Sequence, residues 1–206
     1  MNKSLIKEAM ILTVITLISG VALGFVYEIT KEPIAASEEA AVQAAYKEVF
    51  ETADTFTDIK GFNSTAATKV AANAGYTDDT VDNCVTAIDA DGKTLGYVIT
   101  VTSSAGYAGD ITLSMGVTKA GKMNGYSITT INETAGLGMK AKEDAFKNQF
   151  NNISAGTLEV IKSTPASKSQ IEAISGATIT SRAVTNAVNA GFAYYNSINK
   201  GGSDDE

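Results

Sequence analysis

The 206-residue chain lacks histidine and tryptophan and contains only two prolines and a single cysteine, Cys84. Without histidine most zinc, haem and iron sites are excluded, because imidazole is a principal ligand in such sites. One thiol can form neither an internal disulfide nor a cysteine-rich metal site. The sequence therefore argues against a metal centre held by this chain alone.

Positive charge is also scarce. The chain has 16 lysines and arginines against 23 aspartates and glutamates, which gives a formal net charge of -7. No basic stripe is present to replace phosphate counterions, so we expect no nucleic-acid partner. The length suits one domain of ordinary size, and a hydrophobic fraction of 44% is enough for a packed core.

One long apolar run lies near the N-terminus. Ala9–Tyr27 holds 19 residues without a charge; as a helix it would span roughly 28 Å, close to the hydrocarbon thickness of a bilayer. A cleaved signal peptide is the alternative, but its apolar region would be shorter, about 7–15 residues. Lys3 and Lys7 precede the run and only Lys31 closely follows it. This bias predicts a transmembrane helix at 9–27, with residues 1–8 in the cytoplasm and the rest on the extracytoplasmic side.

The chain after this span divides into three parts. We expect a juxtamembrane helix at 28–50, a domain at 51–197 and a flexible acidic tail at 198–206. Phe146 and Phe150, one turn apart, predict a further amphipathic helix that starts near Ala141. The apolar side of the juxtamembrane helix would carry Ile34, Val42, Tyr46, Val49 and Phe50.

The middle of the chain contains a repeat. Residues 92–99 (GKTLGYVI) align with residues 121–128 (GKMNGYSI), at an offset of 29 and with five of eight positions identical. Each copy follows a polar turn and has the alternation of a half-buried strand, so the repeat predicts two similar hairpins of one antiparallel sheet. A glycine loop follows each copy, at 106–109 and at 135–138. The loops are either plain hairpin ends or places where backbone approaches a flat or phosphorylated ligand.

The segment SGATITS, residues 175–181, precedes a helical pattern. Beyond it, apolar residues recur at the spacing of one helix face, so the segment crosses a helix start. Its hydroxyl groups have two interpretations: they cap free backbone N–H groups, or they belong to an anion site at the positive end of the helix dipole. Small Gly176 and Ala177 would also let a modifying enzyme reach a neighbouring threonine. The apolar face of the helix comprises Ala177, Val184, Val188, Gly191 and Tyr195, with Phe192 beside it.

The element Ser175-Gly-Ala-Thr178 resembles the flavinylation motif of the FMN-binding domain family. That family includes the G subunit of the Rnf electron-transport complex and the C subunit of the sodium-translocating NADH:quinone reductase. In the family, the last threonine of the motif carries FMN through a phosphoester bond made by a flavin transferase that uses FAD. The resemblance implies Thr178 as the acceptor, which would make the chain a covalently modified flavoprotein. Glu172 stands where the family more often has aspartate.

Both glycine loops add to the resemblance. Residues 132–138 (NETAGLG) are similar to the family's Glu-Thr-Pro-Gly-Leu-Gly segment, with Ala135 in place of proline. Residues 106–111 (GYAGDI) resemble its Gly-Tyr-Gly/Ser-Gly-Pro-Ile loop, with Asp110 in the proline position. The short length and single anchor resemble the G subunit of Rnf more than the C subunit of the quinone reductase, which stays the alternative.

The resemblance implies an α+β fold, in which one transmembrane helix precedes a small antiparallel-sheet FMN-binding domain with flanking helices. It also implies an electron carrier, not catalytic alone, which acts with other membrane subunits in electron transfer between ferredoxin and NAD, coupled to sodium or proton movement. In this interpretation Tyr107 stacks on the flavin, Leu137 packs on a ring face and Lys140 offsets phosphate charge. The expected cofactor-binding residues are Thr178, Ser175, Gly176, Ala177, Thr180, Ser181, Glu133, Thr134, Gly136, Leu137, Gly138, Lys140 and Tyr107.

Two other functions fit the residues without the resemblance. An anchored module could bind a phosphorylated small molecule reversibly at the same helix start. A structural or adhesive surface protein would account for the repeat and the acidic surface.

Overall fold

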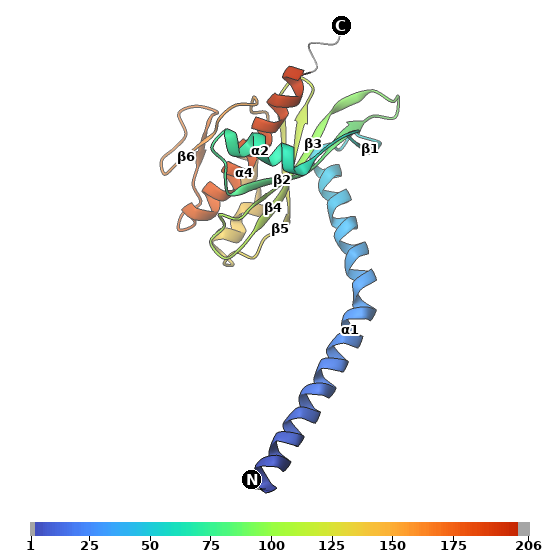
Figure 1. The fold of residues 1–206 in the computed structure, drawn as a ribbon. Helices are drawn as coiled ribbons and strands as arrows, with labels where there is room; N and C mark the ends of the chain where they lie inside the picture. Colours follow the sequence, from blue (N-terminus) through green and yellow to red (C-terminus); the bar gives the residue numbers. More distant parts are fainter. Residues whose placement is uncertain (1–2, 202–206) are drawn as a thin grey trace. The chain divides into compact units, whose positions relative to one another are not determined.

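The structure is a computed structural model that describes residues 3–201. It divides into two compact units, Met1–Ala41 and Val42–Glu206. The residues of the expected acidic tail from 202 to 206 lie outside the described part, as do residues 1 and 2. The two units are described separately below (Figure 1).

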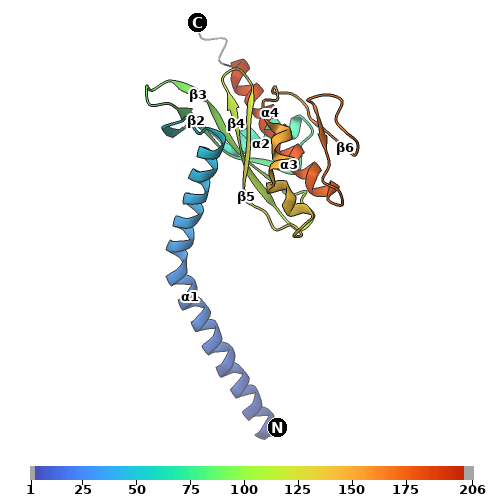
Figure 2. The same cartoon turned by 180° about the vertical axis from the view of Figure 1, so that it is seen from behind.

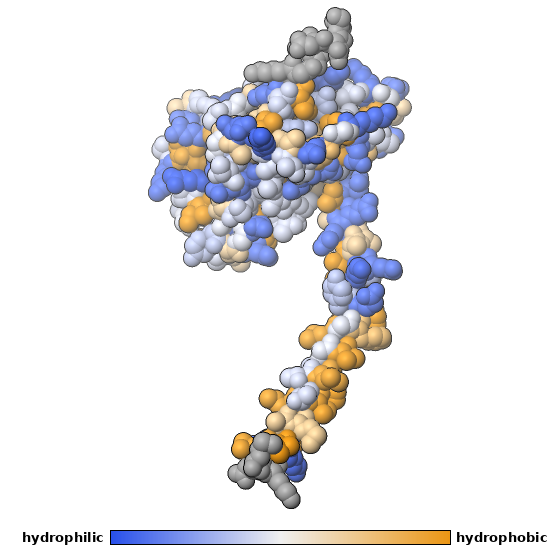
Figure 3. Space-filling model, viewed as in Figure 1, coloured by the Kyte–Doolittle hydropathy of each residue, from blue (hydrophilic) through white to orange (hydrophobic). Residues whose placement is uncertain are grey.

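Helix α1 runs from Lys3 to Val49 without a break and contains Pro33. We expected a transmembrane helix at 9–27 and a juxtamembrane helix at 28–50, and in the structure both ranges lie in this one helix. Strong helix formers surround Pro33 on both sides, and the single hydrogen bond that proline removes does not end the helix. The N-terminal part of α1 is apolar on all sides and long enough to cross a membrane. Figure 3 shows its apolar side chains, followed along the helix by a more polar part.

The last two turns of α1 belong to the second unit. Tyr46, Val49 and Phe50 are buried there and pack against residues of the sheet. Ile34, which we placed on the same apolar side, is 52% exposed and lies in the first unit. The compact second unit therefore begins at Val42, within the range expected for the juxtamembrane helix.

A five-stranded antiparallel sheet forms the centre of the second unit, with its strands in the order of the chain. Consecutive residues of β3 and β4 are buried along most of each strand, as expected for a sheet that is covered on both faces. The strands are β1 (Thr55–Asp58), β2 (Asp79–Ile88), β3 (Thr94–Ser103), β4 (Ile111–Thr118) and β5 (Met123–Thr130).

The predicted repeat is confirmed as two hairpins, β2–β3 and β4–β5. Their turns close through Gly92 N–H to Asp89 and Gly121 N–H to Thr118, at 3.0 and 2.9 Å from the carbonyl oxygens. Because neighbouring strands alternate in direction, β3 and β5 run the same way, and their C-terminal ends lie at the same end of the sheet. The Tyr107 loop (residues 104–110) and the Leu137 turn (residues 132–138) both begin at this end.

The helical segments after β5 differ from the prediction. Instead of one helix from Ala141, three short turns follow each other, and they bring the rings of Phe146 and Phe150 to a centroid distance of 5.5 Å. At the C-terminus, residues 198–201 are helical and not part of a tail, because Ile198 still packs on the core. The elements are η1 (Gly138–Lys142), α3 (Asp144–Lys147), η2 (Asn148–Phe150), the parallel pair β6 (Glu159–Ile161) and β7 (Gln170–Glu172), and α4 (Thr178–Gly201).

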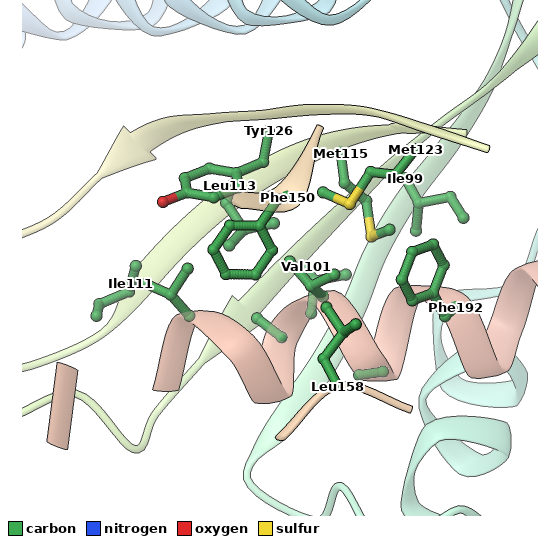
Figure 4. Packing of buried hydrophobic residues seen from close by; sticks show 14 of the residues in the cluster. Ile99, Val101, Ile111, Leu113, Met115, Met123, Tyr126, Phe150, Leu158 and Phe192 are labelled. Carbon is green, nitrogen blue, oxygen red and sulfur yellow. The ribbon is translucent and has the colours of Figure 1, made fainter. Parts of the chain in front are cut away.

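The sheet carries a hydrophobic core on each face. Helix α4 and helix α2 (Ser64–Asn73) contact each other and the same face of the sheet, whereas the end of α1 covers the opposite face. Figure 2 shows the second unit from behind, with α4 next to β4. In the larger core, Ile99 and Val101 of β3 point toward α4, and Ile99 lies next to Phe192 (Figure 4). On the other face, Gly116 leaves room for Val49, whose side chain would lie 2.9 Å from a Cβ at that glycine. The α+β fold is as expected.

Candidate cofactor site

A pocket of ≈ 570 Å³ opens where the Tyr107 loop, the Leu137 turn and the start of α4 meet. This volume lies within the range of small-molecule and cofactor sites, about 300–1,000 Å³. The pocket exists because the two hairpins finish at one end of the sheet and α4 begins beside them. Its walls are Tyr107, Glu133, Thr134, Leu137, Gly138, Gly176, Ala177, Thr178, Ile179 and Thr180.

The start of α4 is held by Ser181 and not by Thr178. The Ser181 hydroxyl accepts a bond from the N–H of Ile174 and donates one to the carbonyl oxygen of Ala177, both at 2.9 Å. Ser181 is fully buried, so its hydroxyl serves the backbone and does not reach a ligand. This arrangement folds the 174–177 segment back onto the first turn of the helix.

Thr178 is the first residue of α4 and has a partly exposed side chain on the pocket wall. Within residues 3–201, its hydroxyl makes no hydrogen bond, and neither do the N–H groups of Thr178, Ile179 and Thr180. Free N–H groups at the first turn of a long helix attract an anion such as phosphate. The residue that we proposed as flavin carrier or helix cap is therefore not acting as a cap.

Glu133 joins the two loops. It is 8% exposed, and its Oε1 accepts hydrogen bonds from the N–H groups of Tyr107 at 2.7 Å and Ala108 at 3.4 Å. Its other oxygen faces Gly138, where a Cβ would lie 2.6 Å from Glu133 Oε2 and 2.7 Å from Thr180 Oγ1. Only a residue without a side chain fits between these groups, so the glycine at 138 lets the Leu137 turn close onto α4.

Three large apolar side chains line the pocket with much of their surface exposed. Tyr107 is 68% exposed, Ile179 52% and Leu137 41%; outside α1, these are the only exposed large apolar residues in the described chain. Each comes from a different segment of the pocket wall. Such a group of exposed apolar surfaces marks a site that buries them against a ligand.

Both units of the chain match known protein families. Residues 106–193 match the family model of the FMN-binding domain, and residues 1–49 match that of the RnfG N-terminal region. The G subunit of the proton-translocating ferredoxin:NAD(+) oxidoreductase complex of Clostridium ljungdahlii is 36% identical over 178 residues, which cover 86% of this chain and 84% of that protein. The chain belongs to the family of Rnf G subunits.

One further relative and one solved structure are also similar to this chain. The G subunit of the Na(+)-translocating ferredoxin:NAD(+) oxidoreductase complex of Acetobacterium woodii is 39% identical over 111 residues, 53% of each chain. The crystal structure of the C subunit of the Na(+)-translocating NADH-quinone reductase from Parabacteroides distasonis has a TM-score of 0.50 and 21% identity, and the match covers 72% of this chain and 79% of that one. The second comparison shows a shared fold.

The residues present in this Rnf G subunit family member fit FMN. The FMN-binding domain match, 106–193, includes every residue that lines the pocket. Tyr107, Leu137 and Ile179 offer apolar surface to a flat ring, and the free N–H groups at the start of α4 offer donors to a phosphate. Ring and phosphate would thus be met by different walls of one pocket.

The structure separates the thirteen predicted residues into groups. Nine line the pocket together: Tyr107, Glu133, Thr134, Leu137, Gly138, Gly176, Ala177, Thr178 and Thr180. Lys140 and Ser175 line a neighbouring pocket of ≈ 470 Å³, together with Glu143 and Glu172. Gly136 shapes the Leu137 turn with a φ of 75°, and Ser181 is the buried backbone partner described above.

Sequence reasoning missed Ile179, which lies between two predicted threonines. A large apolar residue that follows Thr178 and falls off the buried face of α4 is the signal that could have identified it. The structure exposes 52% of this side chain at the pocket.

A buried carboxyl group lies at the base of the Tyr107 loop. Asp79 is 1% exposed at the start of β2, opposite Ser103 at the end of β3. Burial raises the pKa of Asp79 to about 6, with a smaller contribution from neighbouring Asp78 and an opposing one from Ser103. The carbonyl oxygen of Asp78 accepts a bond from the Ser104 N–H at 2.8 Å, which fixes the first residue of the loop.

Proposed function

We propose that this chain is a membrane-anchored electron carrier, the G subunit of an Rnf complex, with FMN attached to Thr178 through a phosphoester bond. A flavin transferase that uses FAD would form this bond during maturation. The protein would act with the other membrane subunits in electron transfer between ferredoxin and NAD, coupled to the movement of sodium ions or protons. It would not turn over a substrate alone.

One observation carries the proposal: the hydroxyl group of Thr178 has no hydrogen-bond partner among the described residues and lies on the rim of an apolar pocket. The hydroxyl that supports the backbone at this turn is that of Ser181, which bonds the Ile174 N–H and the Ala177 carbonyl oxygen. The unused N–H groups of residues 178–180 would hold the phosphate oxygens next to the attachment point.

The other pocket residues would position the cofactor. Leu137 and Ile179 would exclude water from the ring faces, and Tyr107 would stack on the ring from the opposite loop. When bound, FMN supplies one- and two-electron transfer. The protein contributes a fixed position for the cofactor and the electrostatic environment of the ring.

The anchor would place the domain on the extracytoplasmic face. Lys7 precedes the apolar part of α1, whose N-terminus we expect in the cytoplasm. A single cysteine introduced into the exposed turn at 89–92 of the Cys84→Ala protein, which has no other cysteine, tests this orientation. It should react with a membrane-impermeant maleimide in intact cells; protection until the membrane is permeabilised would contradict the orientation.

The attachment can be tested by intact-mass analysis of the full chain produced with and without a flavin transferase. We expect one FMN phosphoester per chain only when the transferase is present, and a fluorescent band that survives denaturing electrophoresis. Thr178→Val should abolish the added mass and change the free energy of unfolding by less than about 0.5 kcal/mol, because the hydroxyl makes no bond within the protein.

Thr134→Val is the matched control. It removes another exposed hydroxyl from the same pocket and should keep the full flavin mass. Flavin mass on the Thr178→Val protein would refute the assignment of the acceptor. Flavin that co-purifies with the wild-type protein and is released by denaturant would instead favour reversible binding.

A further inference from the structure

We propose that Glu133 is a positioning residue that ties the Tyr107 loop to the pocket and, through its negative charge, lowers the midpoint potential of the bound flavin. This inference rests on the proposed function for its redox part. The tie between the loops can be measured in the protein without flavin.

Glu133 Oε1 accepts hydrogen bonds from the N–H groups of Tyr107 at 2.7 Å and Ala108 at 3.4 Å, and these are the only side-chain bonds that hold the middle of this loop within the described chain. The contact joins positions 26 residues apart in sequence. Close packing of the loop reinforces it, since a Cβ at Gly106 would lie 2.1 Å from the Gly109 carbonyl oxygen and 3.1 Å from Glu133 Oε1. The exposed ring of Tyr107 thus has its backbone fixed by one carboxylate.

The same side chain contacts the other two walls of the pocket. Glu133 Oε2 and Thr180 Oγ1 of α4 both lie close to the position that a Cβ at Gly138 of the Leu137 turn would occupy, at 2.6 and 2.7 Å from it. Because one buried side chain touches or adjoins all three segments, its loss should loosen the site as a whole. A residue that only served to end strand β5 would not need to lie next to the other two walls of the pocket.

Glu133 is also the only charged residue that lines the pocket in the part of the chain that the structure describes. No lysine or arginine lies within ion-pair distance of it among residues 3–201, where the ion pair found joins Lys147 to Glu48. Lys140, the nearest basic residue in sequence, lines the neighbouring pocket. The field of the carboxylate at the pocket wall is therefore not cancelled by a paired cation.

An uncancelled negative charge disfavours reduction of a neighbouring flavin. Complete reduction takes up two electrons from the reductant, dithionite in a titration, and one or two protons from water. When only one proton accompanies two electrons, the ring gains one unit of negative charge beside the carboxylate. Removing the charge of Glu133 should therefore raise the midpoint potential.

Two substitutions separate the tie from the charge. Glu133→Gln keeps an oxygen that can accept the Tyr107 N–H but removes the charge, whereas Glu133→Ala removes both. Glu143→Gln is the control, because it removes an exposed carboxylate from the neighbouring pocket only. All four proteins, including the wild type, are produced with the transferase for titration and without it for hydrogen exchange.

In dithionite titrations of the flavin-loaded proteins, Glu133→Gln should raise the ratio of reduced to oxidised flavin about tenfold at a given ambient potential. This equals a shift of about 30 mV for a two-electron couple. Glu143→Gln should leave the potential unchanged. In the flavin-free proteins, the amides of residues 107 and 108 should exchange at least tenfold faster in Glu133→Ala than in the wild type, and at a rate near that of the wild type in Glu133→Gln.

A Glu133→Gln protein with full flavin content and an unchanged potential would overturn the role of the charge. Unchanged exchange at residues 107 and 108 in Glu133→Ala would overturn the tie. If the wild-type protein never acquires flavin, the proposed function fails, while the exchange measurement still decides the tie. Circular dichroism of each variant establishes that it is folded.

Discussion

Replacement of Gly138 by alanine should displace the residues that form the wall of the cofactor pocket. A Cβ at this position would lie 2.6 Å from Glu133 Oε2, 2.7 Å from Glu133 Cβ and 2.7 Å from Thr180 Oγ1. Real Cβ contacts are longer, so either the Leu137 turn or the first turn of α4 has to move. Overpacking of this kind costs about 1–3 kcal/mol, and loss of the Glu133 bond to Tyr107 adds about 1 kcal/mol. We expect a total loss of about 2–4 kcal/mol in the free energy of unfolding.

Gly136→Ala provides the matched control two residues away. Nothing lies within 4 Å of a Cβ there, and only the φ of 75° disfavours alanine, at about 1 kcal/mol. For a domain of this size, 1 kcal/mol lowers the melting temperature by about 2–4 °C. Gly138→Ala should therefore melt about 4–16 °C below the wild type, and Gly136→Ala about 2–4 °C below it.

Thermal unfolding of the flavin-free proteins followed by circular dichroism measures both effects. Intact mass after production with the transferase then measures flavin attachment, which should be strongly reduced in Gly138→Ala and retained in Gly136→Ala. Equal melting temperatures for the two variants would show that the contacts around Gly138 relax freely, and the argument for a closely packed pocket wall would fail.

Three further predictions concern other parts of the second unit. Phe50→Ala should cost about 3–5 kcal/mol in urea unfolding, because it empties a buried position between α1 and the sheet; a loss below 1 kcal/mol would show that α1 does not pack there. The folded state binds the proton of Asp79 more tightly than the unfolded state, so the wild type should lose up to about 3 kcal/mol of stability as pH rises from about 4 to about 6. Asp79→Asn should remove this decline. Parallel pH profiles of the two proteins would contradict this. Burial opposes ionisation of Glu48, yet the hydrogen bonds from Lys147 and Ser127 lower its pKa overall. Lys147→Met should therefore reduce the free energy of unfolding by about 0.5–1 kcal/mol above pH 5. The loss should become smaller as the pH falls below the ordinary pKa of Glu48. An equal loss at pH 3 and pH 7 would exclude an electrostatic origin.

Local patterns in the sequence predicted much of the fold. The offset of 29 residues between two similar segments identified both hairpins, since a strand and its turn are determined by neighbouring residues. Apolar spacing identified α4, where Val184, Val188 and Phe192 are buried as expected. Patterns could not predict that α1 continues through Pro33 or that it ends inside the domain. Those outcomes depend on which distant residues pack against Tyr46 and Phe50.

The sequence predicted which residues line the pocket better than it predicted what each residue does there. Motif resemblance brought together residues from three segments, and the structure gathers nine of them around one pocket. The roles of Ser181 and Glu133 needed coordinates, because a serine that supports the backbone and one that faces a ligand look the same in sequence. Lys140 shows the converse case: it is near the Leu137 turn in the chain, but the η1 turn directs it to a neighbouring pocket.

The overlap of α1 with the domain has a practical consequence for producing a soluble fragment. A cut just beyond the end of α1, after Phe50, would remove the side chains that cover Val85 and Val98 and leave an exposed apolar surface that promotes aggregation. A fragment that starts shortly before Val42 keeps this cover and omits the lipid-compatible segment. The place to separate anchor from domain is thus in the middle of a helix.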